Sequence, residues 1–446
     1  MSAFEPVRFA ALTDVGVKRS HNQDACAAQP AVDAAGFAAH GHVFVVADGM
    51  GGHAVGEKAS AKAVRDIPFL YAKHARDGII PALRRAFQET NAGIYAIGQQ
   101  NPEFRGLGTT STALVLRPEG AWVGHVGDSR AYRIRRGQIE QLTFDHSWVW
   151  EIAKRQGVDP DELGDFKKNV IIRSLGPDPT VDVDIEGPHP VEPGDAFLLC
   201  SDGLTGVVTP QEVGAAVSTM PPDEAARFLV HLANLRGGPD NITVLIVQTP
   251  GGNVPGASGG PKRPSPPARV LAWWNARVPW PFSLLGIGCT LALLSLSLQQ
   301  SGIALLPGLL FGAAAVFILV GLIGLLVQPQ KEPQPGGVEL APDGAPRELK
   351  VYKRHDCTVT PALIERFVEA ERSLLEGMRA QGTPADFDAH ARLAASADEA
   401  ARRPDPIAAF RLRCASLLFL AEAYHKARHK QESFRPNFTP PASGPG

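Results

Sequence analysis

Short runs of apolar and β-branched residues alternate with longer amphipathic stretches over the first 249 of the 446 residues. The longer stretches predict helices at Gly56–Ala75, Ile80–Gln99 and Asp223–Leu235. The short runs predict strands at Val43–Ala47, Ser111–Leu116, Trp122–Val126, Ala131–Arg135, Ala196–Cys200 and Ile242–Val247. Several gaps between runs are too short for a crossover helix, and the step Arg135-Arg136-Gly137-Gln138 is typical of a hairpin turn. The pattern therefore favours an α+β fold in which helices flank antiparallel sheets.

A different pattern begins at Val278, where 53 consecutive positions up to Gln330 carry no charge. Two apolar runs, residues 282–298 and 303–327, lie inside this span on either side of a polar turn. A bilayer core needs about 17–25 apolar residues per helix, so the runs predict a transmembrane hairpin. The alternative is a buried hairpin of a soluble domain. Basic residues on both flanks predict a multi-pass protein of the inner (cytoplasmic) membrane, with both large segments cytoplasmic.

The composition outside these two regions divides the chain into further segments. Gly and Pro are frequent on either side of the charge-free span, which indicates linkers. After the second linker, the apolar spacing predicts helices at Pro361–Gln381, Ala385–Ala401 and Ile407–Gln431. The predicted order is a domain at residues 1–249, a linker at 250–277, two membrane helices within 278–330, a linker at 331–346, a helical C-terminal domain at 347–434 and a disordered tail at 435–446.

Overall charge and cysteine usage exclude some classes of protein. The 44 Lys and Arg residues nearly balance the 46 Asp and Glu residues, which argues against a protein whose main partner is a nucleic acid. The five cysteines form no C-x-x-C pair, so neither a disulfide framework nor a thiolate zinc site is indicated. The N-terminal residues lack the basic and apolar regions of a signal peptide.

Five aspartates occupy the ends of the predicted strands or of strand-like segments, and this is the most informative chemical feature. They are Asp24, Asp48, Asp128, Asp202 and Asp240. Any one of them alone would be an ordinary turn residue. Grouped at the rim of a sheet, however, carboxylates repel one another unless a hard cation lies between them, and oxygen ligands suit Mg²⁺ or Mn²⁺.

Eight short motifs follow one another along the chain, and five of them contain these aspartates. They are T-D-x-G-x-x-R-x-x-N-Q-D at Thr13–Asp24, V-V-A-D-G-M-G-G-H at Val45–His53, G-T-T at Gly108–Thr110, V-G-D-S-R-A-Y at Val126–Tyr132, L-T-x-D-H-S at Leu142–Ser147, N-V-I-I-R-S-L-G at Asn169–Gly176, S-D-G-L at Ser201–Leu204 and D-N-I-T at Asp240–Thr243. With these motifs in this order, residues 7–248 resemble the bacterial metal-dependent serine/threonine protein phosphatases, the PPM or protein phosphatase 2C family. The resemblance implies a central antiparallel β-sandwich flanked by helices, with a two-metal site at one end.

The resemblance also implies a role for each matching residue. Asp48 bridges two Mn²⁺ or Mg²⁺ ions, and the carbonyl of Gly49 ligates the first of them. Asp202 and Asp240 ligate the second ion. Asp128 joins Asp202 at a third, weaker ion, although a turn acid that caps the next segment is the alternative for Asp128.

Three further residues receive roles around the metals. Asp24 holds metal-bound waters, and Arg19 grips the substrate phosphate, with a solvated surface charge as its alternative. Asn241 hydrogen-bonds the phosphate or a bound water. Where some eukaryotic members have a general-acid histidine, this chain has Met50, and we interpret the nearby His53 as a turn or capping residue rather than an acid. A flap that influences substrate choice is expected at Trp148–Lys168.

The function implied is hydrolysis of phosphoserine and phosphothreonine on cytoplasmic proteins by a metal-activated water, in opposition to a serine/threonine kinase. The expected partners are that kinase and its substrates. Two alternatives remain: a phosphatase-like scaffold or sensor that binds phosphoproteins without efficient turnover, and an enzyme for a phosphorylated small molecule. The presence of Asp48, Gly49, Asp202 and Asp240 favours an active protein phosphatase.

Overall fold

The computed structural model describes residues 6–51, 56–104, 106–163, 170–250, 280–299, 306–327 and 351–428. The chain forms two compact units. The first unit combines Met1–Ser258 with Glu348–Gly446, and the second is Gly259–Arg347.

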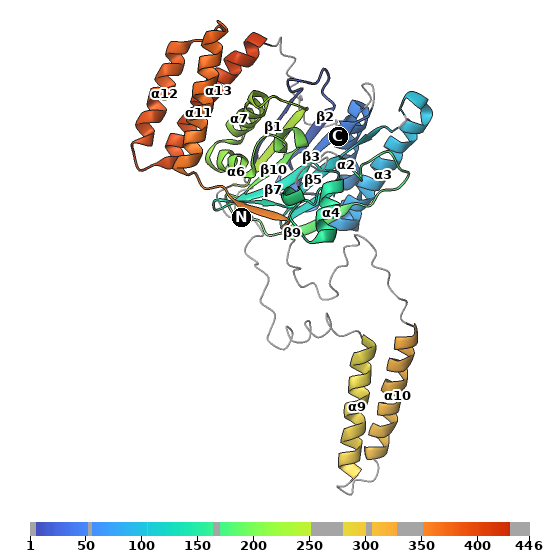
Figure 1. Cartoon of the computed structure of the whole chain (residues 1–446). Helices are drawn as coiled ribbons and strands as arrows, with labels where there is room; N and C mark the ends of the chain where they lie inside the picture. The colour runs from blue at the N-terminus through green and yellow to red at the C-terminus, as the bar shows by residue number, and fades with distance from the viewer. Residues whose placement is uncertain are drawn as a thin grey trace. The chain divides into compact units, whose positions relative to one another are not determined.

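Two antiparallel sheets form the centre of the first unit (Figure 1). Sheet A has the strand order β1 (Arg8–Asp14), β11 (Ile242–Gln248), β10 (Ala196–Cys200), β7 (Arg130–Arg135), β8 (Gln138–Gln141) and β12 (Lys353–Asp356). Sheet B has the order β2 (Asp24–Gln29), β3 (His42–Met50), β5 (Ser111–Arg117), β6 (Gly120–Val126) and β9 (Asp184–His189), and β4 (Gly108–Thr109) pairs with β3.

Helices cover the outer face of each sheet. On sheet B lie α2 (Gly56–His74) and α3 (Ile79–Gln100), and on sheet A lie α6 (Pro210–Thr219) and α7 (Pro222–Leu235). The shorter helices are α1 (Ala34–Ala39), α4 (Trp148–Gln156) and α5 (Asp202–Thr205), with 3-10 turns η1 (Ala75–Asp77), η2 (Pro102–Phe104) and η3 (Pro160–Leu163).

Apolar side chains of both sheets fill the space between them. Phe44 and Leu114 come from sheet B, and Phe197 and Leu245 come from sheet A. Separate apolar clusters join each sheet to its own helices. This four-layer arrangement confirms the predicted class, an antiparallel β-sandwich flanked by helices.

Local sequence features explain why most of the helices and strands form where they do. The turn between β7 and β8 places Arg136 at φ 50° and Gly137 at φ 73°, as a two-residue hairpin turn requires. Helix α6 was not predicted from the apolar spacing. It begins with a capping box, in which Thr209 and Glu212 each accept a hydrogen bond from the other's backbone N–H.

The C-terminal segment differs from the separate domain expected at residues 347–434. Its first described residues form β12, which extends sheet A by pairing with β8. The helices α11 (Pro361–Ala380), α12 (Phe387–Ala401) and α13 (Pro406–Arg428) follow, and α11 and α13 share an apolar core with α6 and α7. The ring of Phe367 lies 5.5 Å from that of Phe228 on α7. Apolar burial against α7 therefore makes this segment part of the first unit.

In the second unit, α9 (Trp280–Gln299) packs against α10 (Leu306–Val327). Gly288 lies close to the side chain of Ile318, so the two helices approach closely at this point. Two helices are thus present where the charge-free span predicts them. Within the part of the chain that the structure describes, however, no helix has the length and apolarity needed to cross a membrane, and the transmembrane hairpin is not confirmed. The predicted linkers and tail lie almost wholly outside the described residues.

Candidate active site

Four of the five predicted aspartates lie at or beside strand ends. Asp24 begins β2 and stands opposite Asp48 of β3 in the antiparallel register. Asp202 follows β10 at the start of α5, and Asp240 lies two residues before β11. Electrostatic interactions connect these four residues.

The fifth, Asp128, lies in the turn between β6 and β7 and interacts electrostatically with Asp48 and Asp202. A cavity of about 510 Å³ opens beside this group, and Arg19, Asp128, Asp202 and Asp240 line it. The structure therefore brings the predicted acids together.

Close backbone packing holds two of these acids near each other. A Cβ atom on Gly203, the residue after Asp202, would lie 1.9 Å from the carbonyl oxygen of Asn241. Only glycine allows the start of α5 to approach the start of β11 this closely.

The backbone of Asp48 is fixed from the neighbouring β4–β5 segment. Its N–H donates to the hydroxyl of Thr110 at 2.9 Å, and its carbonyl accepts from the hydroxyl of Thr109 at 2.8 Å. The G-T-T motif thus has a positioning role.

Asp24 is held by two hydroxyl groups that the sequence did not single out. Ser201 and Thr243 each donate a hydrogen bond of 2.7 Å to its Oδ2 atom. Both residues belong to motifs that were noted for their acids, S-D-G-L and D-N-I-T. These bonds fix one oxygen of Asp24 and leave Oδ1 directed elsewhere.

Burial makes the ionised forms of these carboxyls unfavourable. Burial raises the pKa of Asp24 to about 7, in spite of the two hydroxyl donors. Burial and the repulsion from neighbouring carboxylates raise the pKa of Asp128 to about 8 and that of Asp202 to about 6. The pKa of Asp48 is raised well above its ordinary value for the same two reasons. A cation in the group would remove this penalty.

Unpaired oxygens provide a direct test of whether the residues fit a metal. Among the described side chains, Oδ1 of Asp24, of Asp128 and of Asp202 is buried without a hydrogen-bond partner. A buried carboxylate oxygen without a donor is costly, so each of these atoms calls for a cation or a water. Three such oxygens in one group of interacting acids, two of which line the cavity, fit a hard divalent ion.

The protein side chains alone do not provide a complete set of metal ligands. Within the described residues, no three His, Cys, Asp or Glu side chains form a ready-made metal cluster. Mg²⁺ and similar ions usually keep several waters and bind one or two carboxylates together with substrate phosphate. The carboxylates, the Gly49 carbonyl and water are therefore a suitable donor set.

Arg19 lies at the open side of the group. Its Nη2 atom donates to Oδ2 of Asp240 at 2.7 Å, and 53% of its side chain is exposed. It is therefore paired with a predicted metal ligand rather than fully solvated. Its position at the cavity allows a guanidinium to reach a phosphate beside the acids.

Asn241 makes hydrogen bonds that the sequence did not predict. Its side-chain amide donates to the carbonyls of Val15 and His21, at 2.9 and 3.0 Å, and its Oδ1 accepts from the N–H of Gln23 at 2.8 Å. Through these contacts, the amide of Asn241 holds the loop that carries Arg19. Asn241 thus positions that loop, and its predicted hydrogen bond to a phosphate or a bound water stays a prediction.

The turn that carries Asp128 is held by a histidine. The Nδ1 atom of His146 accepts from the N–H of Gly127 at 3.0 Å, and its Nε2 atom lies 3.1 Å from Asp184. Arg173 donates to the same aspartate at 2.9 Å. His146 and Arg173 come from the L-T-x-D-H-S and N-V-I-I-R-S-L-G motifs, whose roles the sequence left open.

The predicted flap contains α4 and η3, and both border the cavity through Trp150 and Asp161. Two residues from outside residues 1–249, Lys353 and His355 of β12, also line it. Nothing in the sequence around β12 indicated this placement. His53 lies outside the described residues, so its prediction is not tested.

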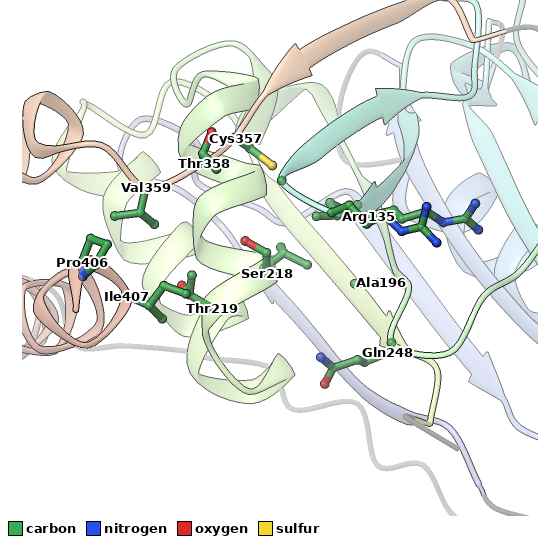
Figure 2. Close-up of a pocket in the computed structure, with 15 residues that line it drawn as sticks. Arg135, Ala196, Ser218, Thr219, Gln248, Cys357, Thr358, Val359, Pro406 and Ile407 are labelled. Carbon is green, nitrogen blue, oxygen red and sulfur yellow. The ribbon is translucent and has the colours of Figure 1, made fainter. Parts of the chain in front are cut away.

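A second cavity, of about 410 Å³, lies between α6, the segment after β12 and the start of α13 (Figure 2). Its lining combines apolar groups such as Val359 and Ile407 with hydroxyls of Ser218 and Thr219. None of the described residues that line it is an Asp, Glu or His. It offers no comparable acid chemistry, so the cavity beside the aspartates is the candidate active site.

Comparison with known proteins agrees with this geometry. Residues 17–227 match the family profile "Protein phosphatase 2C". Protein phosphatase PhpP of Streptococcus pneumoniae is 38% identical over 242 residues, which cover 53% of this chain and 95% of that protein. The chain belongs to the protein phosphatase 2C family.

Other members of the protein phosphatase 2C family match in the same way. A serine/threonine phosphatase, stp, of Listeria monocytogenes is 35% identical over 242 residues, or 53% of this chain and 93% of that protein. The crystal structure of the Mycobacterium tuberculosis serine/threonine phosphatase PstP/Ppp superposes with a TM-score of 0.50 at 31% identity. It covers 55% of this chain and all of that chain.

The protein phosphatase 2C profile includes Arg19 and the acids from Asp24 to Asp202, and it ends before Asp240 and well before β12. The chemical centre of the cavity is therefore mostly a family feature. The side formed by Lys353 and His355 lies outside the matched residues.

Proposed function

We propose that this chain is a metal-dependent serine/threonine protein phosphatase that hydrolyses phosphoserine and phosphothreonine with a water at a two-metal centre. One observation carries the proposal. Asp24, Asp128 and Asp202 each have a buried carboxylate oxygen without a partner; Asp128 and Asp202 line a cavity that Arg19 also lines, and Asp24 interacts electrostatically with Asp202. An acid group of this kind fits divalent cations, and the arginine fits the phosphate that such cations attract.

Each residue of the group has a chemical task in this proposal. Asp48, Asp202 and Asp240, with the Gly49 carbonyl, would hold Mn²⁺ or Mg²⁺, and Asp128 with Asp202 would hold a third, weaker ion. When bound, the ions would supply a water acidified toward hydroxide and positive charge for the phosphoryl oxygens.

The protein's own groups orient the reaction. Asp24, fixed by Ser201 and Thr243 at 2.7 Å, presents its free oxygen as an acceptor that can align a water's proton. Arg19 donates to the phosphate and so neutralises charge that grows as the phosphorus–oxygen bond breaks.

The names of the relatives support a phosphoprotein substrate. PstP/Ppp and stp are named serine/threonine phosphatases, and PhpP is named a protein phosphatase. A protein substrate is therefore preferred here over a phosphorylated small molecule. A scaffold without turnover is disfavoured, because none of the predicted metal-binding positions is replaced.

The partner kinase and the cellular location stay predictions. A kinase partner follows only from the proposed substrate class. Membrane attachment has the charge-free residues 278–330 in its favour, whereas no helix of the described residues meets the requirement of a bilayer span. Fractionation of the full chain after a salt wash tests it, since apolar attachment resists salt and surface charge does not.

Phosphate release from a phosphothreonine peptide tests the activity. The full chain is first treated with a chelator and then assayed with and without Mn²⁺. We expect release only when Mn²⁺ is returned. Absence of release with Mn²⁺, together with retained binding of the peptide, would favour the scaffold instead.

A further inference from the structure

One wall of the active-site cavity comes from the C-terminal segment. Strand β12 pairs with β8 in antiparallel register, with Lys353 opposite Gln141 and His355 opposite Ile139. Alternate residues of a strand share a face, so Lys353 and His355 point to the same side. Both line the cavity that also contains Arg19, Asp128 and Asp202. About one hundred residues separate this wall from β11, the preceding strand of sheet A.

Lys353 connects this wall to the flap. Its Nζ atom lies 2.8 Å from Oδ1 of Asp159 and 2.6 Å from Oδ2 of Asp161, at the start of η3. The same atom lies 5.3 Å from the centre of the Trp150 ring on α4. Only 12% of the lysine side chain is exposed, so it is largely enclosed by these partners.

Neighbouring contacts fix β12 itself. Tyr352 donates a hydrogen bond of 2.5 Å to Glu186 of β9, and its ring lies 5.6 Å from that of Phe144. On the face of β12 opposite Lys353, Arg354 pairs with Glu140 of β8 at 2.6 Å. The strand is therefore anchored independently of Lys353, and it can act as a fixed support for η3.

We propose that Lys353 is a positioning residue that holds η3 at the active-site cavity, so that the C-terminal segment helps to select protein substrates. This inference rests on the proposed phosphatase function. A phosphopeptide needs surface on both sides of its phosphorylated residue, whereas a small aryl phosphate occupies only the acid group. The lysine pairs with Asp159, just before η3, and with Asp161 within it, and neither is a predicted metal-binding residue.

The segment is also absent from the family match. The profile ends at residue 227, and the match to PhpP already covers 95% of that protein. PhpP therefore has few residues left for an equivalent of β12. The wall distinguishes this chain from such relatives at a point where a substrate would meet it.

The test uses the full chain with Mn²⁺ and two substrates, a phosphothreonine peptide and p-nitrophenyl phosphate. For Lys353→Ala we expect the KM of the peptide to rise about three- to tenfold, the size expected when partly exposed ion pairs are lost. The kcat for the peptide and both constants for p-nitrophenyl phosphate should stay within about twofold. Lys353→Arg can pair with both aspartates and should restore the peptide KM.

A matched control and a double variant separate positioning from direct contact. Arg372→Ala removes an exposed charge on α11 that neither borders the cavity nor anchors β12, and it should leave the peptide KM unchanged. Asp159→Asn with Asp161→Asn should raise the peptide KM as much as Lys353→Ala does, and combining all three should add little. Additive effects would mean that Lys353 touches the substrate itself, and would overturn the positioning role.

Hydrogen exchange provides a readout that does not depend on activity. Loss of the lysine should speed exchange of the amides of Asp161–Leu163 by at least about threefold, because a local contact that keeps them closed is gone. Unchanged exchange, or equal losses for both substrates, would overturn the inference. If the wild type hydrolyses neither substrate while exchange in η3 responds, the contact stands and the proposed function fails.

Discussion

The two sides of the active-site cavity differ in how they are built. The acid side comes from strand ends within the family match, where Asp24 is buried, Asp48 and Asp202 are half-buried, and the three carboxylates repel one another. The β12 side consists of Lys353 and His355, from a strand that joins sheet A after the second unit has intervened. Repulsion between the neighbouring carboxylates destabilises the acid side, and a bound cation would remove this repulsion. On the β12 side, Lys353 is already paired with Asp159 and Asp161, so we expect changes there to alter substrate recognition rather than the chemistry.

The largest expected effect concerns the acid side alone. Asp48→Asn and Asp202→Asn remove a negative charge that would hold a cation, and metal stabilisation of the transition state is worth several kcal/mol. We expect kcat to fall about 10³-fold or more for the phosphothreonine peptide and for p-nitrophenyl phosphate alike. Steady-state assays with Mn²⁺ check this, with Asp223→Asn, an exposed change on α7, as the control. A loss confined to the peptide would assign these acids to recognition.

The C-terminal segment is expected to stabilise the fold as well as to line the cavity. Phe367 is 1% exposed and packs against Phe228 and Phe410, so Phe367→Ala should lower the free energy of unfolding by about 3–5 kcal/mol. Denaturant unfolding measures this, and Ile407→Ala, at a position that is 52% exposed, should cost less than about 0.5 kcal/mol. Equal stabilities for the two variants would mean that the segment does not share the core of the first unit.

This dependence bears on the fragment 1–249, which contains every predicted metal ligand. The fragment lacks Phe367 and Phe410 of the shared core and Lys353 of the cavity wall. We therefore expect a fragment with lower stability and weaker peptide recognition than the full chain. Its activity toward p-nitrophenyl phosphate, measured at a temperature where it remains folded, should be close to that of the full chain.

Because the neighbouring carboxylates repel one another in the folded chain, the free energy of unfolding should depend on pH. The folded-state pKa values of about 7 for Asp24 and about 8 for Asp128 lie above the ordinary value of 3.8. The folded state therefore keeps protons that the unfolded chain releases, and stability falls as the pH rises through these values. The buried histidines His42, His125 and His189 have lowered pKa values and act in the opposite direction below about pH 6.5, so the comparison is made above it.

Thermal unfolding in chelator at pH 6.5 and pH 8.5 measures this slope. We expect the metal-free chain to melt at a lower temperature at pH 8.5, and Mn²⁺ to raise the melting temperature more at pH 8.5 than at pH 6.5. Asp128→Asn should flatten the metal-free slope and raise stability in chelator. Metal-free stability that increases with pH would show that the acids do not repel one another in the folded chain.

The smallest effect is expected at Arg19, on the exposed edge of the acid side. Arg19→Lys keeps the charge and loses the fork that can donate two parallel hydrogen bonds, so KM should rise about three- to tenfold for both substrates. Mn²⁺ affinity should stay within about twofold. Lys18→Ala, the neighbouring surface charge, should change neither quantity. A collapse of Mn²⁺ affinity with KM unchanged would assign Arg19 to the metal site through its bond to Asp240.

Sequence patterns predicted the acid side because its signals are local. Apolar strands such as Ala196–Cys200 end within two residues of an aspartate, and both the strand and the acid can be recognised within a few residues. The role of Asn241 was missed because its partners, the backbones of Val15, His21 and Gln23, lie more than 200 positions away. No single motif records such a contact.

Strand β12 could not be predicted for a related reason. Its sequence, Lys-Arg-His-Asp, has no apolar alternation, and it is a strand only because the free edge of β8 is available to pair with it. The helices α11 and α13 were predicted from their apolar spacing, but that spacing does not say which surface they cover. Burial against α7 therefore turned an expected separate domain into a part of the first unit.

Two features define the proposed site: divalent ions bind the acid group, and β12 forms another wall of the same cavity. Anomalous diffraction at a manganese-sensitive wavelength, from crystals of the full chain grown with Mn²⁺, tests both features at once. We expect anomalous peaks within coordination distance of Asp48, Asp202 and Asp240, with β12 paired to β8 and Lys353 paired with Asp159 and Asp161. Peaks that avoid these aspartates, or a cavity that β12 does not border, would contradict the proposed site.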